Sequence, residues 1–137
     1  MTERSGKSAQ LVYSLLCEDV RLELGNKLSL MGIFENVFLP SFPAMMLKFA
    51  TVNHWIGVGD FETQVRIAAP DGRELAVSAP SAFRIESQGY ADNVTFFANV
   101  QLERAGTYQV RIYLDGKIVI EKPLFVRPLQ QPPSTLN

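Results

Sequence analysis

The sequence is short of the residues that most often carry chemistry. Its 137 residues include one cysteine (Cys17), one histidine (His54) and one tryptophan (Trp55). A single cysteine forms no intrachain disulfide, and a single histidine builds no multi-histidine metal site, so we expect a fold held without disulfide or metal. We also predict no cofactor, because the sequence has no glycine-rich phosphate or dinucleotide loop. It has no serine in a nucleophile-elbow context either, which leaves a poor catalytic inventory.

A charge excess of one sign and a long apolar run are missing as well. The net charge is −1 and the basic residues are scattered singly, which predicts no nucleic-acid binding. No apolar run approaches the ~20 residues of a membrane span, so no membrane partner is expected. The N-terminal MTERSGKSAQ is charged and lacks the apolar stretch of a secretory signal. With the lone cysteine, this predicts a cytoplasmic protein.

Alternating apolar and polar side chains are what the sequence has instead. Apolar residues make up 47% and charged residues 20%, an ordinary balance for one folded domain. Residues 94–127 alternate with a period of two and predict three consecutive strands. Turn signals recur about every 8–12 residues, a spacing typical of a β-sandwich, and no segment favours a helix.

Three turns predict hairpins with three-residue loops. Each loop places Gly or Asn where the backbone must be left-handed. At the first and third turns a two-residue loop would slip the register by one and turn apolar side chains outward, so we favour the odd loops. At the second turn, Pro-Asp-Gly suits a type I turn followed by a left-handed glycine. The loops are Leu24-Gly25-Asn26, Pro70-Asp71-Gly72 and Leu114-Asp115-Gly116. The expected pairs are Leu22 with Leu28, Val20 with Leu30, Ile67 with Leu75, Val65 with Val77, Ile112 with Ile118, and Val110 with Ile120.

Other segments are less regular. Residues 10–17 are nearly all apolar, as in a buried strand or a short helix, and we favour the strand. Residues 32–43 end in two prolines, so this segment leaves the sheet or runs along its edge. Beyond Ala50 we expect the strand to pass into a loop around Gly57 and Gly59.

The domain boundaries follow from these patterns. We expect a flexible N-terminus at 1–9, a single sandwich domain at 10–127 and a disordered, proline-rich tail at 128–137. Residues 78–93 are hardest to interpret, and we expect one strand there, around 83–86.

The stretch Gly106-Thr107-Tyr108 resembles the tyrosine corner of immunoglobulin-like sandwiches, in which a Tyr at a strand start hydrogen-bonds to nearby backbone. The alternative is a turn followed by a buried Tyr. Val110 stands where true immunoglobulin domains carry their second cysteine. The fold we predict is an antiparallel immunoglobulin-like β-sandwich of about eight strands with no disulfide.

A series of short motifs, in order along the chain, carries a closer resemblance. Together they resemble an uncharacterised family of small bacterial proteins, a domain of unknown function built as a compact β-sandwich. The resemblance implies fold and bacterial origin, and it brings no activity or cofactor. The motifs are Leu16-Cys17-Glu18-Asp19, Gly25-Asn26-Lys27-Leu28, Met31-Gly32-Ile33-Phe34-Glu35-Asn36-Val37, Phe42-Pro43, Pro70-Asp71-Gly72, Gly106-Thr107-Tyr108 and Leu114-Asp115-Gly116.

Trp55 is the strongest single candidate for a contact residue. A Trp in a sandwich is more often core, but this one has polar neighbours, lies beside glycines and stands in a stretch without proline. Trp is enriched among binding hot spots, so we hypothesise an interface for a protein partner or a homodimer. Its candidate residues are Asn53, His54, Trp55, Ile56 and Phe61.

Three functions remain open from the sequence. The favoured one is a non-catalytic interaction module that binds a protein partner or itself through loops or a sheet edge. The second is a small-ligand or carbohydrate binder that uses Trp55 with Asn53 and Asp60. The third, an enzyme, would need Cys17, His54 and a carboxylate to converge, whereas a free Cys after an apolar run is usually buried.

Overall fold

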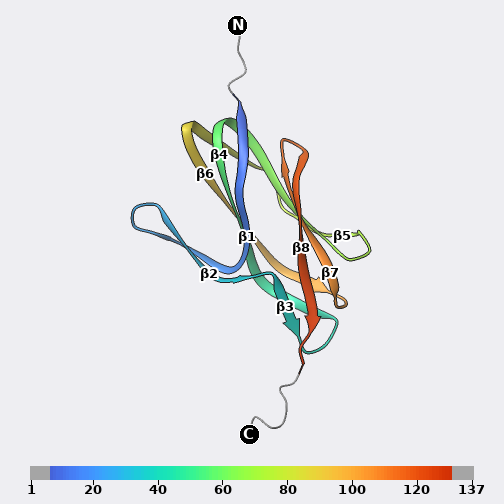
Figure 1. The fold of residues 1–137 in the computed structure, drawn as a ribbon. Coiled ribbons are helices and arrows are strands. Elements are labelled where there is room, and N and C mark those ends of the chain that lie inside the picture. The colour runs from blue at the N-terminus through green and yellow to red at the C-terminus, as the bar shows by residue number, and fades with distance from the viewer. Residues whose placement is uncertain (1–6, 131–137) are drawn as a thin grey trace.

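The computed structural model describes residues 7–130, which form eight β-strands and no helix (Figure 1). The all-β class is therefore confirmed. The strands are β1 (Ser8–Glu23), β2 (Lys27–Phe34), β3 (Asn36–Leu39), β4 (Ala44–Ala68), β5 (Glu74–Val77), β6 (Ser81–Leu102), β7 (Gly106–Leu114) and β8 (Lys117–Pro128).

The strands form one mixed sheet that curls into a half-barrel. Its order is β2-β1-β4-β7-β8-β3, and β5 and β6 also pair with β4. β3 and β8 run parallel, and the other pairs are antiparallel. The predicted antiparallel immunoglobulin-like sandwich of two sheets is thus wrong.

The length of β4 explains the single sheet. β4 runs for 25 residues, pairing first with β1 and β6 and then with β7 and β5, so it joins what would otherwise be two sheets. Gly57 and Gly59 lie inside this strand at φ +147° and +127°, where its register with β6 shifts. A Cβ on Gly57 would collide with the backbone of Ser8. The loop predicted there is wrong, because these glycines bend a continuous strand.

The parallel pair comes from the segment that was expected to leave the sheet or follow an edge. β2 ends at Phe34, and the chain then crosses to place β3 beside the end of β8. Pro40 and Pro43 lie in the loop after β3, and the Phe42–Pro43 peptide is cis. The edge prediction for residues 32–43 is confirmed.

The first hairpin has the predicted loop and register. Glu23 pairs with Lys27, Leu22 with Leu28 and Val20 with Leu30, and Asn26 has φ +60°. The strand at 10–17 is also confirmed, because it is the start of β1.

The second hairpin has the predicted loop but not the predicted register. Ala69 donates its N–H to Arg73 O across Pro70-Asp71-Gly72, and Gly72 has φ +92°. A bulge next to Ala68 then shifts the ladder by one residue. Ile67 therefore pairs with Ala76 rather than Leu75, and Val65 does not pair with Val77.

The third hairpin contradicts the prediction. Leu114 pairs with Lys117 across a two-residue turn, in which Asp115 and Gly116 have φ +49° and +80°. A bulge follows, so Ile112 faces Ile120 and Val110 faces Lys122. The parity argument assumed that the apolar side chains of β8 are buried, whereas Ile118 and Ile120 are 50% and 39% exposed.

Two hydrophobic clusters hold the sheet together. The larger fills the inside of the half-barrel and includes Trp55, Tyr108 and Phe49, each about 1% exposed or less. The smaller lies under the β1–β2 hairpin, where Cys17, Ala50 and Val52 are buried and contact Val20, Leu28, Leu30 and Val94. This second cluster holds the base of the hairpin against the body.

The ordered ends differ from the predicted domain limits. Ser8 and Ala9 already belong to β1, and β8 continues to Pro128. β6 runs unbroken through most of 78–93, well beyond the strand expected at 83–86. The predicted flexibility of residues 1–6 and disorder of 131–137 lie outside the described residues. No helix among residues 7–130 is long and apolar enough to cross a membrane.

Candidate interaction surface

The tip of the β1–β2 hairpin exposes large apolar side chains. Leu24 is 95% exposed and Leu22 is 71% exposed. Figure 1 shows the hairpin extending sideways from the body, with its tip beyond the strands that support its base. The apolar stripe that begins at Val20 over the smaller cluster thus continues into solvent. Such side chains point to a contact surface.

A groove of about 510 Å³ lies between β3 and the first residues of β4. Phe34, Met46 and Phe49 form its deeper part, and Leu47 on its wall is 72% exposed. Phe38 and Met45 are also about half exposed, at 54% and 47%. A groove with methionines can adapt to an apolar partner, because the thioether side chain has many accessible rotamers.

Consecutive residues of both strands line this groove. On one wall they are 36–39 of β3, and on the other 45–49 of β4. β3 pairs with β8 on one side only. Residues 45–49 of β4 pair with β6 on one side, and on the other side β4 pairs with β1 only from Ala50 onward. The groove therefore runs along two strand edges, where backbone N–H and C=O groups are available to a partner.

Charged side chains stand at the rim of the groove where the hairpin begins. Glu18 and Lys48 line it, and the Lys48 ammonium lies 3.4 Å from Asp19 Oδ1 and 5.0 Å from the centre of the Phe96 ring. The pKa of Asp19 is lowered, chiefly by the backbone N–H of Val20 and then by Lys48. The rim thus offers one acidic and one basic group within reach of a docked chain.

A row of aromatic rings crosses the outer face of β1, β4 and β6. His54 stacks on Tyr13 with centroids 4.9 Å apart and planes 5° apart, and its ring lies 5.3 Å from Tyr90. His54 Nδ1–H donates to Asp92 Oδ1 at 2.6 Å. Burial, and then the Asp92 charge, raises the pKa of Tyr13. Tyr13 and Tyr90 in this row are 39% and 55% exposed.

The structure keeps Cys17 away from His54. Cys17 pairs with Ala50 and Tyr13 pairs with His54, so the two positions are four residues, or about 13 Å, apart along the strands. Cys17 is fully buried, and this burial, with the charge of Asp19, raises the pKa of its thiol. A raised pKa disfavours the nucleophilic thiolate. The pair required by the enzyme hypothesis is not brought together.

The predicted interface residues separate between the two faces of β4. Trp55 and Asn53 are fully buried, and Phe61 is 7% exposed. Trp55 Nε1–H donates to Asn93 Oδ1 at 2.6 Å inside the half-barrel. His54 is partly exposed and Ile56 is 42% exposed, both on the outer face. The interface hypothesis for residues 53–61 stays a prediction, with His54 and Ile56 as its accessible members.

Polar side chains also lie inside the half-barrel. The amide atoms of Asn53 and the hydroxyl of Thr51 are buried and have no hydrogen-bond partner among residues 7–130. Across from them, Lys122 extends from β8 and donates to Ser14 O on β1. Burial lowers the pKa of Lys122, and the nearby Glu35 opposes this shift. Asp60, named for the carbohydrate hypothesis, is exposed and lies 3.5 Å from Arg84.

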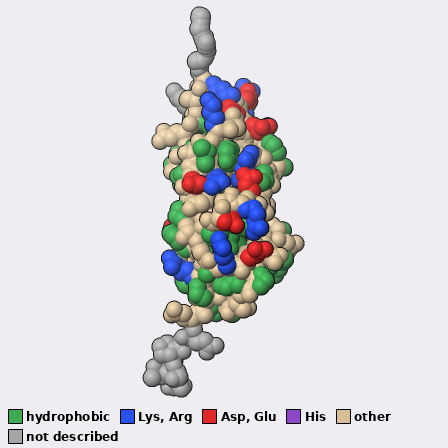
Figure 2. Space-filling model, turned by 90° about the vertical axis from the view of Figure 1, so that its right-hand side faces the viewer, with side chains coloured by type: hydrophobic (Ala, Val, Ile, Leu, Met, Phe, Trp, Pro, Cys, Tyr) green, Lys and Arg blue, Asp and Glu red, His purple; other side chains and the backbone are tan. Residues whose placement is uncertain are grey.

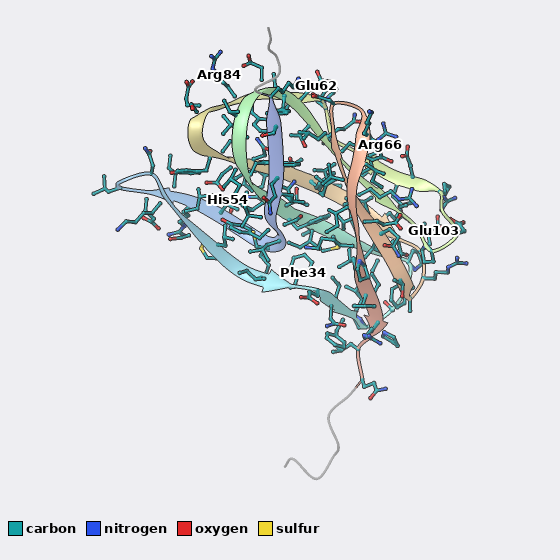
Figure 3. All side chains as sticks on the ribbon, turned by 45° about the horizontal axis from the view of Figure 1, so that its top comes forward. Phe34, His54, Glu62, Arg66, Arg84 and Glu103 are labelled. Carbon is teal, nitrogen blue, oxygen red and sulfur yellow. The ribbon has the colours of Figure 1, made fainter. Side chains whose placement is uncertain are left out.

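The opposite side of the molecule has a different character. Acidic and basic side chains are interspersed over the face that carries β5, β7 and β8 (Figure 2). Its ion pairs are Arg66–Glu74 at 3.2 Å, Arg111–Glu121 at 2.6 Å and Arg73–Glu103 at 3.5 Å. His54 lies on the side of the β1–β2 hairpin, whereas Arg66 and Glu103 lie on the side that carries these ion pairs (Figure 3). Exposed ion pairs of this kind keep a surface solvated and add little stability.

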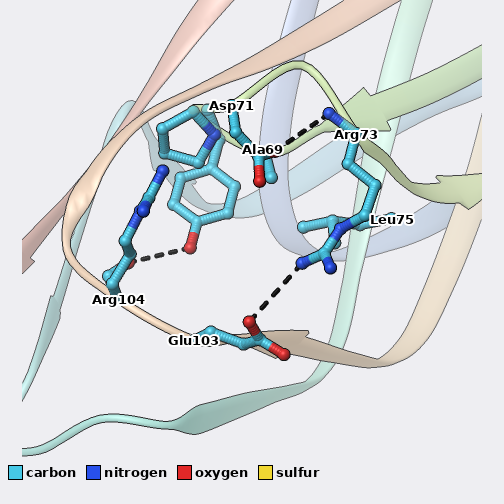
Figure 4. Close-up of a pocket in the computed structure, with 8 residues that line it drawn as sticks. Ala69, Asp71, Arg73, Leu75, Glu103 and Arg104 are labelled. Atoms are coloured by element: carbon cyan, nitrogen blue, oxygen red, sulfur yellow. Dashed lines mark hydrogen bonds and ion pairs between the residues drawn. The ribbon is translucent and has the colours of Figure 1, made fainter.

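A small cavity on that side is part of the fold. It measures about 40 Å³ and is lined by Tyr108, Arg73 and Glu103 among others (Figure 4). Tyr108 O–H donates to Arg104 O at 2.8 Å, which confirms the hydrogen bond predicted from the tyrosine-corner resemblance. A space of this size holds little more than a water or two.

Sequence reasoning missed both the groove and the tip. Leu24 was placed correctly in a turn, and an apolar residue in a turn was a signal that its side chain would be exposed. Met45, Leu47 and Phe49 alternate along the sequence as one face of a strand would, but only Phe49 is buried. The edge position of β3, inferred from its prolines, was the one clue to the groove.

The chain belongs to a family of unknown function (DUF6941), whose sequence model matches residues 12–127. This supports the predicted resemblance to an uncharacterised family. No curated protein matches the chain.

Solved structures show a similar fold at very low identity. Two structures of a β-glucosidase from Listeria innocua, in complex with isofagomine and with glucose, match with TM-scores of 0.54 and 0.53. Each is 9% identical, and each match covers 92% of this chain and 17% of the glucosidase. The chain thus corresponds to less than a fifth of that enzyme, and at this identity the likeness concerns the fold alone.

Proposed function

We propose that this protein is a non-catalytic interaction module that binds a polypeptide through the groove between β3 and β4. The observation that carries the proposal is the coincidence of apolar exposure with strand edges. Leu47, Phe38 and Met45 are the exposed apolar walls, and the main chain of both strands borders the space between them. A polypeptide uses both features at once, since its side chains bury the apolar walls and its backbone pairs with an edge.

The distribution of chemistry supports binding rather than catalysis. His54 and Asp92 form a pair on the outer sheet face, away from the buried Cys17. In a non-catalytic module the pair serves to order the aromatic row. A cytoplasmic location is part of the proposal and rests on the single free cysteine. Bacterial origin likewise stays an expectation from the resemblance.

The test is site-specific photo-crosslinking in cells that express the protein. A photoreactive amino acid replaces Leu47 in the groove, and in a matched control it replaces the exposed Lys117 at the β7–β8 turn. We expect a discrete cross-linked polypeptide at position 47 and none at position 117. The cross-link should disappear when Met45→Asp is added beside it. Equal labelling at both positions, or none at position 47, would overturn the proposal.

A small polar ligand, such as a carbohydrate, is the second candidate. The aromatic row favours it, because Tyr13 and Tyr90 are 39% and 55% exposed beside the hydrogen-bonded His54 and Asp92. The ring of Trp55, on which this hypothesis first rested, is enclosed in the core. A sugar titration followed by NMR should shift the His54 and Tyr13 ring signals if the row binds sugars. Unmoved signals up to millimolar sugar would rule this candidate out.

A further inference from the structure

Two apolar surfaces are left uncovered by residues 7–130, and they match each other. Among the large hydrophobic side chains of residues 7–130, the three most exposed are Leu24, Leu47 and Leu22. Two of them form the tip of the β1–β2 hairpin, and the third lies on the wall of the groove. A projecting apolar tip and an apolar groove on one chain are the two halves of a contact between copies.

We propose that the occupant of the groove is the β1–β2 hairpin tip of a second copy of this chain. This inference rests on the proposed function and names the partner of the same groove. Leu24 enters between the walls formed by Phe38 and Leu47, and Leu22 covers the open side. The methionines at 45 and 46 adapt to the inserted side chains.

The charges at the two surfaces are complementary. At the tip, Glu23 on β1 lies directly opposite Lys27 on β2, so the ribbon carries one charge of each sign beside Leu24. The groove carries Glu18 and Lys48 at its rim. A docked tip sets Lys27 against Glu18, whereas the Lys48 ammonium is already paired with Asp19 Oδ1 at 3.4 Å. The pairing fixes the orientation of the tip more than it adds affinity.

The position of the groove lets the contact close on itself. Glu18 belongs both to the groove and to the base of the hairpin, six residues or about 20 Å from Leu24. Two hairpins aligned antiparallel place each tip at the base of the other. The contact is then made twice about a two-fold axis, which gives a closed dimer rather than a filament.

The hairpin is built to act as such an arm. Its base is fixed on the smaller cluster of Cys17, Ala50 and Val52, so it projects at a set angle. Its outer part is a two-stranded ribbon, a structure that is marginally stable in water unless packed on another surface. Docking supplies the missing surface for the ribbon and a cover for the groove.

The test uses purified full-length protein and two single substitutions in exposed positions. Leu24→Asp removes the tip, and Leu47→Asp places a charge in the groove. Val119→Asp on the β7–β8 hairpin is the control, since Val119 is also exposed, at 44%. Circular dichroism confirms folding, and sedimentation equilibrium from micromolar to millimolar protein gives the dimerisation constant.

We expect the native chain and Val119→Asp to dimerise equally and each of the other variants to dimerise at least about tenfold more weakly. In a mixture of Leu24→Asp and Leu47→Asp, one of the two contacts joins an intact tip to an intact groove. Heterodimers should therefore form at protein concentrations at which neither variant dimerises alone. A native chain that stays monomeric, a Leu24→Asp variant that dimerises like the native chain, or a mixture without heterodimers would overturn the inference.

This outcome is separable from that of the proposed function. Cross-linking from position 47 to a different polypeptide, with the purified chain monomeric, would reject the second copy as occupant and keep the groove as a binding site. Absence of both the cross-link and the dimer would reject both.

Discussion

The β1–β2 and β7–β8 hairpins have similar turn residues but differ in their contacts with the rest of the sheet. Both turn through residues with positive φ, at Gly25 and Asn26 in the first and at Asp115 and Gly116 in the second. Both expose apolar side chains. The β7–β8 turn, however, is bound to the body, because Asp115 donates its N–H to Glu62 O at 2.8 Å and accepts the Glu62 N–H on Oδ1 at 2.9 Å.

The first hairpin is braced from within. Its cross-strand side-chain hydrogen bond, from Ser29 Oγ to Glu23 Oε2 at 2.8 Å, joins its own two strands. Its fixed part is the base, at the smaller hydrophobic cluster and the Asp19–Lys48 ion pair. We infer that a hairpin whose base and turn are both bound to the body is part of the scaffold. A hairpin that is bound only at its base is available to a partner.

Valine at the two turn glycines tests this difference most strongly. Gly116 has φ +80° and Gly25 has φ +79°, and no backbone lies near the site of an added Cβ at either position. Gly116→Val should lower the free energy of unfolding by roughly 1–3 kcal/mol, because a β-branched residue resists positive φ. Gly25→Val carries the same strain, but local fraying of the free tip relieves it, so we expect a loss under about 1 kcal/mol.

Urea denaturation followed by tryptophan fluorescence measures both variants. Trp55 lies in the main core and reports global unfolding. Equal losses at the two positions would show that the first hairpin is fixed as firmly as the second.

The anchor of the second hairpin should depend on pH. The Glu62 N–H, and next the Lys7 ammonium at 3.1 Å, lower the pKa of Asp115 against the opposing effect of partial burial. A lowered folded-state pKa means that the stabilisation is complete above the unfolded value of about 3.9 and is lost as the pH falls through the folded value. Asp115→Ala should cost about 1–2 kcal/mol at pH 7 through the lost acceptor and the strain of Ala at positive φ.

Asp115→Asn is the matched control, because Asn tolerates positive φ and keeps an oxygen acceptor. It should lose less than the Ala variant at pH 7. The stability gap between the native chain and Asp115→Asn should narrow below about pH 4. A gap that is constant from pH 7 to pH 3 would contradict the role of the carboxylate charge.

Local turn chemistry was predictable, and global curvature was not. The Leu24-Gly25-Asn26 loop followed from parity alone, because strand pairing next to a turn is a local matter. Parity failed at Ile118 and Ile120, because it requires that an apolar side chain be buried. These two residues of β8 are 50% and 39% exposed in the half-barrel. A β-bulge between Ile112 and Tyr113 shifts the β7–β8 register by one residue.

The same limit explains the missed architecture and part of the candidate site. Gly57 and Gly59 interrupt the alternating strand pattern, and such an interruption is equally consistent with a loop and with a bend inside a continuous strand. Only the pairing of β4 with four other strands distinguishes the two. A Trp in a sandwich is more often part of the core, and Trp55 is buried there. The groove could not be found from the sequence in this way, because its lining residues come from two strands, β3 and β4, that are separate in the sequence. No periodicity within one segment contains that information.

A charge at the tip of the free hairpin should leave stability almost unchanged. Leu24 is 95% exposed, so Leu24→Asp removes little buried area. We expect the urea midpoint of the monomer, measured at low micromolar protein, to change by no more than about 0.5 kcal/mol in free energy. A loss above about 1 kcal/mol would show that the tip is packed on the body, and the distinction between the two hairpins would fail.

The smallest effect is expected from EDTA and from reducing agent. The β1–β2 and β7–β8 turns form through residues with positive φ, and Cys17 is a buried free thiol. No cluster of three or more potential metal ligands occurs among residues 7–130. Unfolding curves of the native chain should therefore coincide with and without EDTA, and with and without dithiothreitol. A clear drop on chelation would reveal an oxygen-ligand site, and the acidic turn at Asp115 would be the first place to look, since a bound cation there would replace Lys7 as the partner of its carboxylate.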